Sequence, residues 1–168
     1  VCSAPTGITV SGQTTDSAVL SWTAPTGSSV TGYDYYISPV NTVTPGTTPT
    51  GNTTNTTVTV GNLAQAVTYY FWVRTNCGVV DGTSVWQGPM AVNALISNDN
   101  CPDAITVPVN DGIECVETVP GTVIAATPSA TGTVCAGTPA KDVWFEFTAE
   151  APTHMIRLLN MSITYATT

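Results

Sequence analysis

The chain has 168 residues, and 8% of them are charged, where an average soluble domain carries about 25%. Three basic residues stand against eleven acidic ones, which gives a formal net charge of −8. This balance excludes binding to a nucleic-acid backbone and opposes contact with anionic membranes. No apolar run approaches the roughly 18 residues that a membrane-spanning segment needs.

Short runs of alternating apolar and polar residues recur along the first part of the chain, and helical periodicity is nearly absent. Such alternation is typical of half-buried strands separated by turns of Gly, Pro and Asn. The predicted strands contain, in chain order, GITVSG, SAVLSW, GYDYYIS, TVTVGNL, TYYFWV and TSVWQGPMAV. Six or seven strands within about 95 residues match the size of one immunoglobulin-like sandwich.

The stretch TYYFWVRTNCG, residues 68–78, combines four aromatic residues with the first basic residue of the chain. Alternation divides its side chains between an inner face, with Tyr69, Phe71 and Val73, and an outer face, with Tyr70, Trp72 and Arg74. We expect Arg74 to lie over an outward aromatic ring with its guanidinium in water. The spacing from Leu63 to Tyr69 predicts a tyrosine corner, in which the hydroxyl bonds back to the preceding turn.

The five cysteines include no CxxC pair, and only one histidine accompanies them, so a zinc site is poorly supported. Disulfides fit better and indicate an oxidising, extracytoplasmic location. Cys2 precedes the first predicted strand and Cys77 follows the aromatic strand, so a bridge between them would close a loop of about 75 residues. The alternative is that both are unpaired.

The remaining cysteines are Cys101, Cys115 and Cys135, which cannot all pair among themselves. We expect a bridge between Cys101 and Cys115 or between Cys115 and Cys135. The third thiol would then pair outside these residues.

Residues 1 to about 95 resemble a fibronectin type III domain in APTGITV, AVLSWTAP, TGYDYYIS, NLAQAVTYYFWVRTNC and TSVWQGPMAV. The C-x2-P start, the cysteine after VR and the S-x-W-x-G-P run resemble the variety found in secreted proteins of Bacteroidetes. The resemblance implies that Trp22 is the core tryptophan of the second strand and that Tyr69 is the corner tyrosine. No RGD tripeptide occurs, so integrin-type adhesion is not implied.

The segment NALISNDNC, residues 93–101, reads as a linker into a second, more acidic unit with the strand-like runs AITVPV, GTVIAAT, DVWFEFTA and THMIRLLNMSIT. Their order, interrupted by cysteines, resembles the first part of a jelly-roll-like sandwich module of Bacteroidetes surface proteins, related to prepeptidase C-terminal domains. We therefore predict an all-β chain of two β-sandwich domains in tandem. Residues 1–95 form the fibronectin type III domain, and residues 96–168 form a second, incomplete module.

Candidate ligand-binding residues are few. The outward aromatic rings that could stack on sugars are Tyr36, Tyr70, Trp72 and Trp86, and the alternative is that they cover a neighbouring domain. The oxygen-rich stretch SNDNCPD makes Asp99 and Asp103 candidate calcium ligands, against an ordinary role in turns. The tripeptide DSA resembles an O-glycosylation motif of Bacteroidetes exports, with Ser17 as the acceptor.

Nothing in the sequence indicates catalysis, because His154 is the only histidine and no GxSxG, HExxH or Walker-type run occurs. We expect a non-enzymatic adhesion or spacer segment of a large secreted or cell-surface bacterial protein. Its partners would be other domains of the same protein, surface proteins or glycans, with no nucleic acid, no membrane insertion and no cofactor besides calcium. The alternative is an accessory region of a secreted hydrolase such as a peptidase or glycanase.

Overall fold

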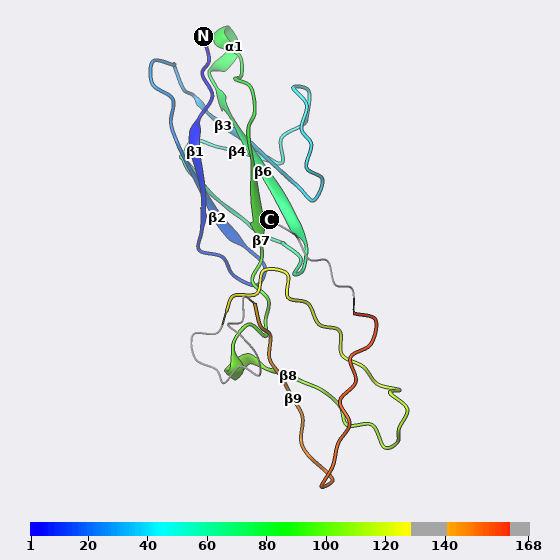
Figure 1. Cartoon of the computed structure of the whole chain (residues 1–168). Coiled ribbons are helices and arrows are strands. Elements are labelled where there is room, and N and C mark those ends of the chain that lie inside the picture. Colours follow the sequence, from blue (N-terminus) through cyan, green and yellow to red (C-terminus); the bar gives the residue numbers. More distant parts are fainter. Residues whose placement is uncertain (129–140, 162–168) are drawn as a thin grey trace.

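The computed structural model describes residues 1–128 and 141–161 (Figure 1). Its first part contains seven strands and one short helix. They are β1 (Thr6–Ser11), β2 (Ala18–Thr23), β3 (Gly32–Ser38), β4 (Gly51–Thr53), β5 (Thr57–Val60), β6 (Thr68–Asn76), α1 (Gly78–Asp81) and β7 (Gln87–Asn93). All six predicted strands are present. The seventh, β4, lies in a polar run of Gly, Asn and Thr that shows no apolar alternation.

The strands form two antiparallel sheets, one in the order β1-β2-β5 and the other in the order β4-β3-β6-β7. The core lies between them and is built from the alternating inward residues of both sheets. From β2 it receives Ala18, Leu20 and Trp22, which are 0%, 0% and 5% exposed. From β6 it receives Phe71 and Val73, both fully buried. The all-β sandwich prediction is therefore confirmed for this part of the chain.

Two aromatic residues fix the geometry of this core. The ring of Trp22 on β2 lies edge-on to Tyr33 of β3, with 5.3 Å between centroids, and stacks on Phe71 of β6 at 6.0 Å. Trp22 thus joins the two sheets. Burial raises the pKa of the Tyr33 phenol above its ordinary value of 10.0, because the ionised form would lose its hydration in the core.

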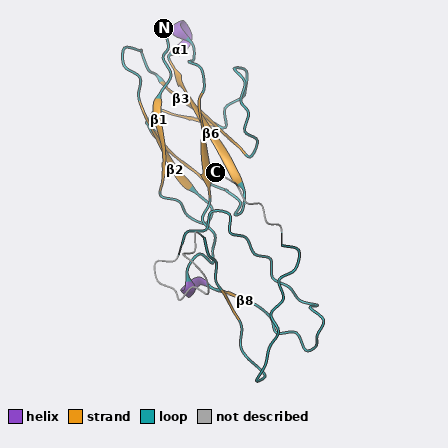
Figure 2. Ribbon diagram, viewed as in Figure 1, coloured by secondary structure: helices purple, strands orange, loops and turns teal. Residues whose placement is uncertain are grey.

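The described chain beyond Asn93 contains little regular structure, as Figure 2 shows by the predominance of loop below the sandwich. It forms the 3-10 turn η1 (Cys101–Asp103) and two short strands, β8 (Ile105–Thr106) and β9 (Phe145–Glu146), which pair in parallel. Neither helical element approaches the length of a bilayer-spanning helix, and the described residues contain no other helix that does.

The predicted strands of the second unit are therefore only partly formed. Two of the four strand-like runs supply β8 and β9, while residues 121–127 and 154–161 form no strand. A short strand is stable only when another strand pairs with its backbone and another element covers its apolar face. Without them the apolar side chains stay in solvent, and Ile113, Ile156 and Leu158 are 80%, 76% and 74% exposed.

Candidate functional site

The outer face of the β4-β3-β6-β7 sheet carries a buried ion pair. Asp34 on β3 lies directly opposite Arg74 on β6 in the ladder, and the Arg74 Nε donates to the Asp34 Oδ2 at 3.0 Å. The Arg74 side chain is 14% exposed and the Asp34 side chain is 12% exposed. The guanidinium lies 4.5 Å from the ring centroid of Trp86, so the predicted stacking on an outward aromatic is present. The guanidinium is only partly in water, because Asp34 and Trp86 cover much of it.

Trp72 is also covered, although it lies on the outer face. Its ring lies 5.7 Å from Tyr36 and 6.2 Å from Tyr70, measured between centroids, and it is 3% exposed. The backbone of Gly88 closes the remaining side, since a Cβ there would lie 2.7 Å from the Trp72 ring. Trp72 therefore offers no face to a sugar, and its selection as a glycan-stacking residue is wrong.

The other outer aromatics, Tyr36, Tyr70 and Trp86, are half-buried. Tyr36 contacts Trp86 as well as Trp72, with 6.4 Å between the Tyr36 and Trp86 centroids. Because these rings pack on one another, together they support the Arg74 side chain more than they form an open platform.

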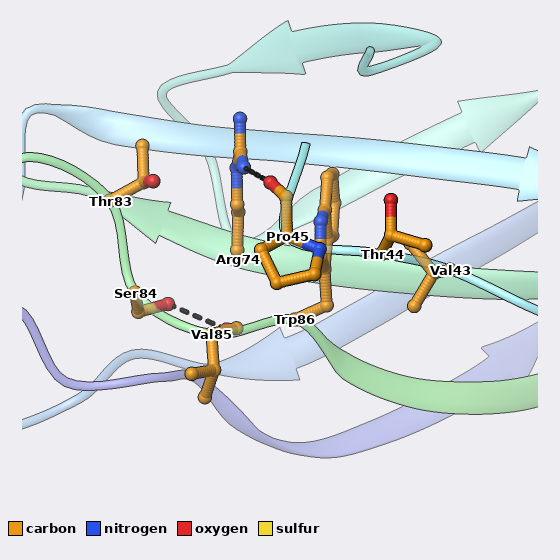
Figure 3. Close-up of a pocket in the computed structure, with 8 residues that line it drawn as sticks. All are labelled: Val43, Thr44, Pro45, Arg74, Thr83, Ser84, Val85 and Trp86. Atoms are coloured by element: carbon orange, nitrogen blue, oxygen red, sulfur yellow. Dashed lines mark hydrogen bonds between the residues drawn. The ribbon is translucent and has the colours of Figure 1, made fainter. Parts of the chain in front are cut away.

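A pocket of about 380 Å³ opens beside the ion pair. It is lined by Val43, Thr44, Pro45, Arg74, Thr83, Ser84, Val85 and Trp86. Figure 3 shows the Arg74 guanidinium and the Trp86 indole standing side by side, with Pro45 next to both. The Arg74 Nη1 donates to the Pro45 carbonyl at 3.2 Å, which ties the 39–50 loop to β6. Sequence reasoning missed this pocket, because three separate segments form it.

A disulfide closes one end of the sandwich. Cys2 and Cys77 are bonded, with 5.8 Å between their Cα atoms and 75 residues between them in sequence. The bridge joins the segment before β1 to the end of β6, where α1 begins. Cys101 and Cys115 carry free thiols, so a bridge between these two is not formed, and Cys135 lies outside the described residues.

The turn before β6 contains the hydrogen bond of a tyrosine corner. The backbone N–H of Ala64 donates to the Tyr69 hydroxyl at 3.2 Å, and the Tyr69 ring packs against the core. Near this end of the sandwich, Thr14 and Ser17 join their hydroxyl groups at 2.7 Å. Ser17 is only partly exposed in that turn, and its glycosylation stays a prediction.

The two candidate calcium ligands have different surroundings. Both carboxylate oxygens of Asp99 accept hydrogen bonds from Thr127, at 2.7 Å from the backbone N–H and at 2.6 Å from the hydroxyl. Asp103 is exposed on η1. Within residues 1–128 and 141–161, no group of three or more His, Cys, Asp or Glu side chains could hold a metal ion. Asp99 thus has a structural role, because it anchors residue 127 to the linker.

His154 closes a local turn. Its Nε2 accepts hydrogen bonds from the backbone N–H groups of Glu150 and Ala151, each at 3.2 Å, and its ring lies edge-on to Phe147. These contacts explain the histidine without a catalytic role.

The ion pair leads to a stability prediction. Asp34→Asn leaves the buried guanidinium of Arg74 without a compensating charge but keeps an oxygen acceptor. We expect the free energy of unfolding to fall by about 2 kcal/mol, less than the roughly 3–5 kcal/mol of complete removal of one buried partner. Urea denaturation followed by circular dichroism measures this loss. The matched control Asp111→Asn, at an exposed acid, should change stability by less than about 0.5 kcal/mol, and equal effects of both changes would contradict the role of the pair.

Comparisons with known proteins place the sandwich in a family. A family model described as "Fibronectin type III domain" matches residues 3–89. A search of curated proteins finds no match. A solved structure titled "Myokine structure" is similar at 22% identity, with 56% of this chain and 98% of that chain covered and a TM-score of 0.46. Domains A168-A170 of titin are 28% identical, with 56% and 32% covered and a TM-score of 0.46.

The fn3 domain of the human collagen alpha-1(XX) chain is 24% identical, with 55% of this chain and 85% of that chain covered and a TM-score of 0.43. The family match spans just over half of the chain and ends inside β7. It contains the core tryptophan, the corner tyrosine and Cys77, and Cys2 of the disulfide lies one residue before it. The chain therefore belongs to the fibronectin type III family.

Proposed function

We propose that the chain is a non-enzymatic adhesion or spacer segment of a large secreted or cell-surface bacterial protein. The path of the chain carries this proposal. The chain enters the sandwich beside the Cys2–Cys77 bridge and leaves it at the opposite end, after β7 (Figure 1). A module whose two connections lie at opposite ends adds its full length to a tandem array.

The exit from the sandwich is fixed by hydrogen bonds, as a spacer requires. Leu95 donates its backbone N–H to the Thr14 carbonyl at 2.7 Å, and the Ser97 N–H donates to the Gln65 side chain at 3.3 Å. Ile96 is buried. Residues 95–97 are thus held against the sandwich, and these contacts fix the direction in which the chain leaves it.

The extracellular location rests on the domain type and the disulfide, which persists in oxidising compartments. The bacterial origin, in the Bacteroidetes, rests on the C-x2-P start and the S-x-W-x-G-P run. Fibronectin type III domains are generally non-catalytic modules, and the turn-closing contacts of His154 support the absence of activity in this chain.

Residues 96–168, in this proposal, are the first part of a jelly-roll-like module. The support is the resemblance of their strand-like runs together with the exposed apolar side chains, such as Met155 at 73% and Val116 at 83% exposure. In a complete sandwich these side chains would be covered by further strands. The resemblance to modules related to prepeptidase C-terminal domains also favours the second candidate, an accessory region of a secreted peptidase or glycanase. The flanking sequence separates the two, because a catalytic motif there supports the hydrolase and further repeats support the adhesin.

Small-angle X-ray scattering tests the spacer role. A compact globule of 168 residues has a radius of gyration of about 15 Å. We expect a clearly larger value, above about 20 Å, because the second unit continues from one end of the sandwich. Reduction of the disulfide serves as a control, since it should leave this dimension nearly unchanged. A radius of gyration near the compact value would contradict the end-to-end arrangement.

A further inference from the structure

We infer that the pocket between residues 43–45 and 83–86 binds one neutral N-acetylated sugar residue. This assignment deepens the proposed adhesion role, on which it rests, by naming the class of ligand and the place where it binds. Figure 3 shows the side chains that surround the pocket. Arg74, which lines this pocket, is the only basic residue in the first 140 positions.

The guanidinium of Arg74 retains unused donors. Arginine has five N–H donors, and the described contacts use the Nε toward Asp34 and the Nη1 toward Pro45. The Nη2 group has no partner among the described residues, and it is absent from the fully buried polar atoms that lack one. It is therefore reachable by a ligand, and a bound acceptor would replace water at a partly buried charged donor.

The electrostatics favour a neutral acceptor over an anion. Asp34 already compensates the charge of Arg74 at 3.0 Å, and the whole chain carries a net charge of −8. A carboxylate or phosphate would gain little attraction from this neutralised pair in a chain of negative net charge. A carbonyl oxygen accepts the same hydrogen bond and carries no charge that would need compensation.

The walls of the pocket combine apolar and hydroxyl groups. Val43, Pro45 and Val85 supply apolar surface, and the Val85 side chain is 76% exposed at the pocket. The Thr83 hydroxyl has no partner in the described chain, whereas the Ser84 hydroxyl is engaged with Val85 and Thr75. An acetamido group matches this lining, because its carbonyl accepts from Arg74 and its methyl group contacts the apolar wall. Ring hydroxyls of the same sugar can then reach Thr83.

The size and the backbone of the pocket favour a sugar over a peptide. Its volume of about 380 Å³ is at the small end of the range for ligand pockets, roughly 300–1,000 Å³. Extended peptides usually add a strand to an open sheet edge. Here Arg74 lies on β6, between β3 and β7, and the neighbouring segment already pairs with β6 through the Ser84 N–H and the Thr75 carbonyl. The backbone of β6 beside Arg74 is therefore already paired on both sides.

The test is a titration of the full chain with N,N′-diacetylchitobiose, followed by amide and Arg Nε–H chemical shifts in NMR spectra. We expect saturation with a Kd of about 1 mM, as for a small neutral ligand in an open pocket, and shifts at Arg74, Thr83 and Val85. Cellobiose, which lacks the acetamido groups, should bind at least about tenfold more weakly. Equal binding of the two disaccharides, or shifts confined to other residues, would overturn the assignment.

Variants at exposed positions test the place without disturbing the fold. Val85→Glu puts a carboxylate at the pocket and should weaken chitobiose binding about tenfold, and Thr83→Ala should weaken it about threefold. The matched control Val40→Glu changes a valine that is 61% exposed and is not part of the lining, so it should bind like the parent. Unchanged binding by Val85→Glu would disprove the site.

Two further outcomes separate this assignment from its alternatives. An N-acetyl-lysine peptide that binds as tightly as chitobiose would overturn the sugar and leave only the acetamido chemistry. If the chain is elongated in solution scattering but does not bind chitobiose, the pocket assignment is wrong and the spacer role still holds.

Discussion

Replacement of Trp22 by alanine should lower the free energy of unfolding by about 3–5 kcal/mol, the usual range for a large aromatic core residue. Trp22 is 5% exposed and belongs to β2, while its two ring partners, Tyr33 and Phe71, belong to the opposite sheet. Truncation therefore removes contacts between the sheets as well as apolar burial. Since native domains are stable by only about 5–15 kcal/mol, such a loss takes a large part of the total.

Two control variants make this prediction specific. The Trp22 Nε1 is buried and has no partner among the described residues, so Trp22→Phe removes an unsatisfied donor while it keeps an aromatic ring. Its loss should be about 1 kcal/mol, well below that of alanine. Val80→Ala, at a side chain 92% exposed, should change stability by less than about 0.5 kcal/mol. A melting temperature of Trp22→Ala within one or two degrees of the parent would contradict the described core.

The sandwich could be predicted from the sequence because the inner faces of its strands follow a regular alternation of apolar residues. In β2 and in residues 69–73 of β6 every second residue is apolar, and Leu20, Phe71 and Val73 are fully buried as that period requires. The cover of an outer face does not follow from the same period. Trp72 is outward by alternation, yet Tyr36 and Gly88, from two other strands, enclose it.

The ion pair shows the same limit. Arg74 could be placed on the outer face from its position after TYYFWV, but its partner Asp34 lies 40 residues earlier. Only the register between β3 and β6 brings the two opposite each other, and register depends on tertiary packing. The pocket beside them depends further on the 39–50 loop, which has no periodic pattern from which its path could be read.

In the second unit, the alternation of apolar and polar residues is not sufficient to predict strands. Residues 121–127 alternate as strands do, and yet Val123 and Ile124 are 49% and 44% exposed and belong to no strand. Alternation states which side chains could share a face, but a strand forms only when a neighbour satisfies its backbone groups. The described residues of this unit supply that neighbour only for β8 and β9.

Removal of the Cys2–Cys77 bridge should reduce stability by about 4 kcal/mol. The bridge spans 75 residues, and in the chain-entropy account a loop of that length restricts the unfolded chain by about this amount. Because it joins the start of the sandwich to the end of its central strand β6, its loss also frees the segment before β1. The double variant Cys2→Ala/Cys77→Ala should therefore unfold at a markedly lower urea concentration than the oxidised parent.

The measurement compares urea denaturation of the parent, the double variant and Cys101→Ala. Cys101 is an exposed free thiol, so its replacement controls for the loss of a cysteine without a bridge and should leave the midpoint unchanged. Under reducing conditions the parent should fall to the stability of the double variant, because only the covalent link distinguishes them. Peptide mapping without reductant should recover Cys2 and Cys77 in one linked fragment. Recovery of both as free thiols, or equal midpoints for the parent and the double variant, would show that the bridge does not hold this end of the sandwich together.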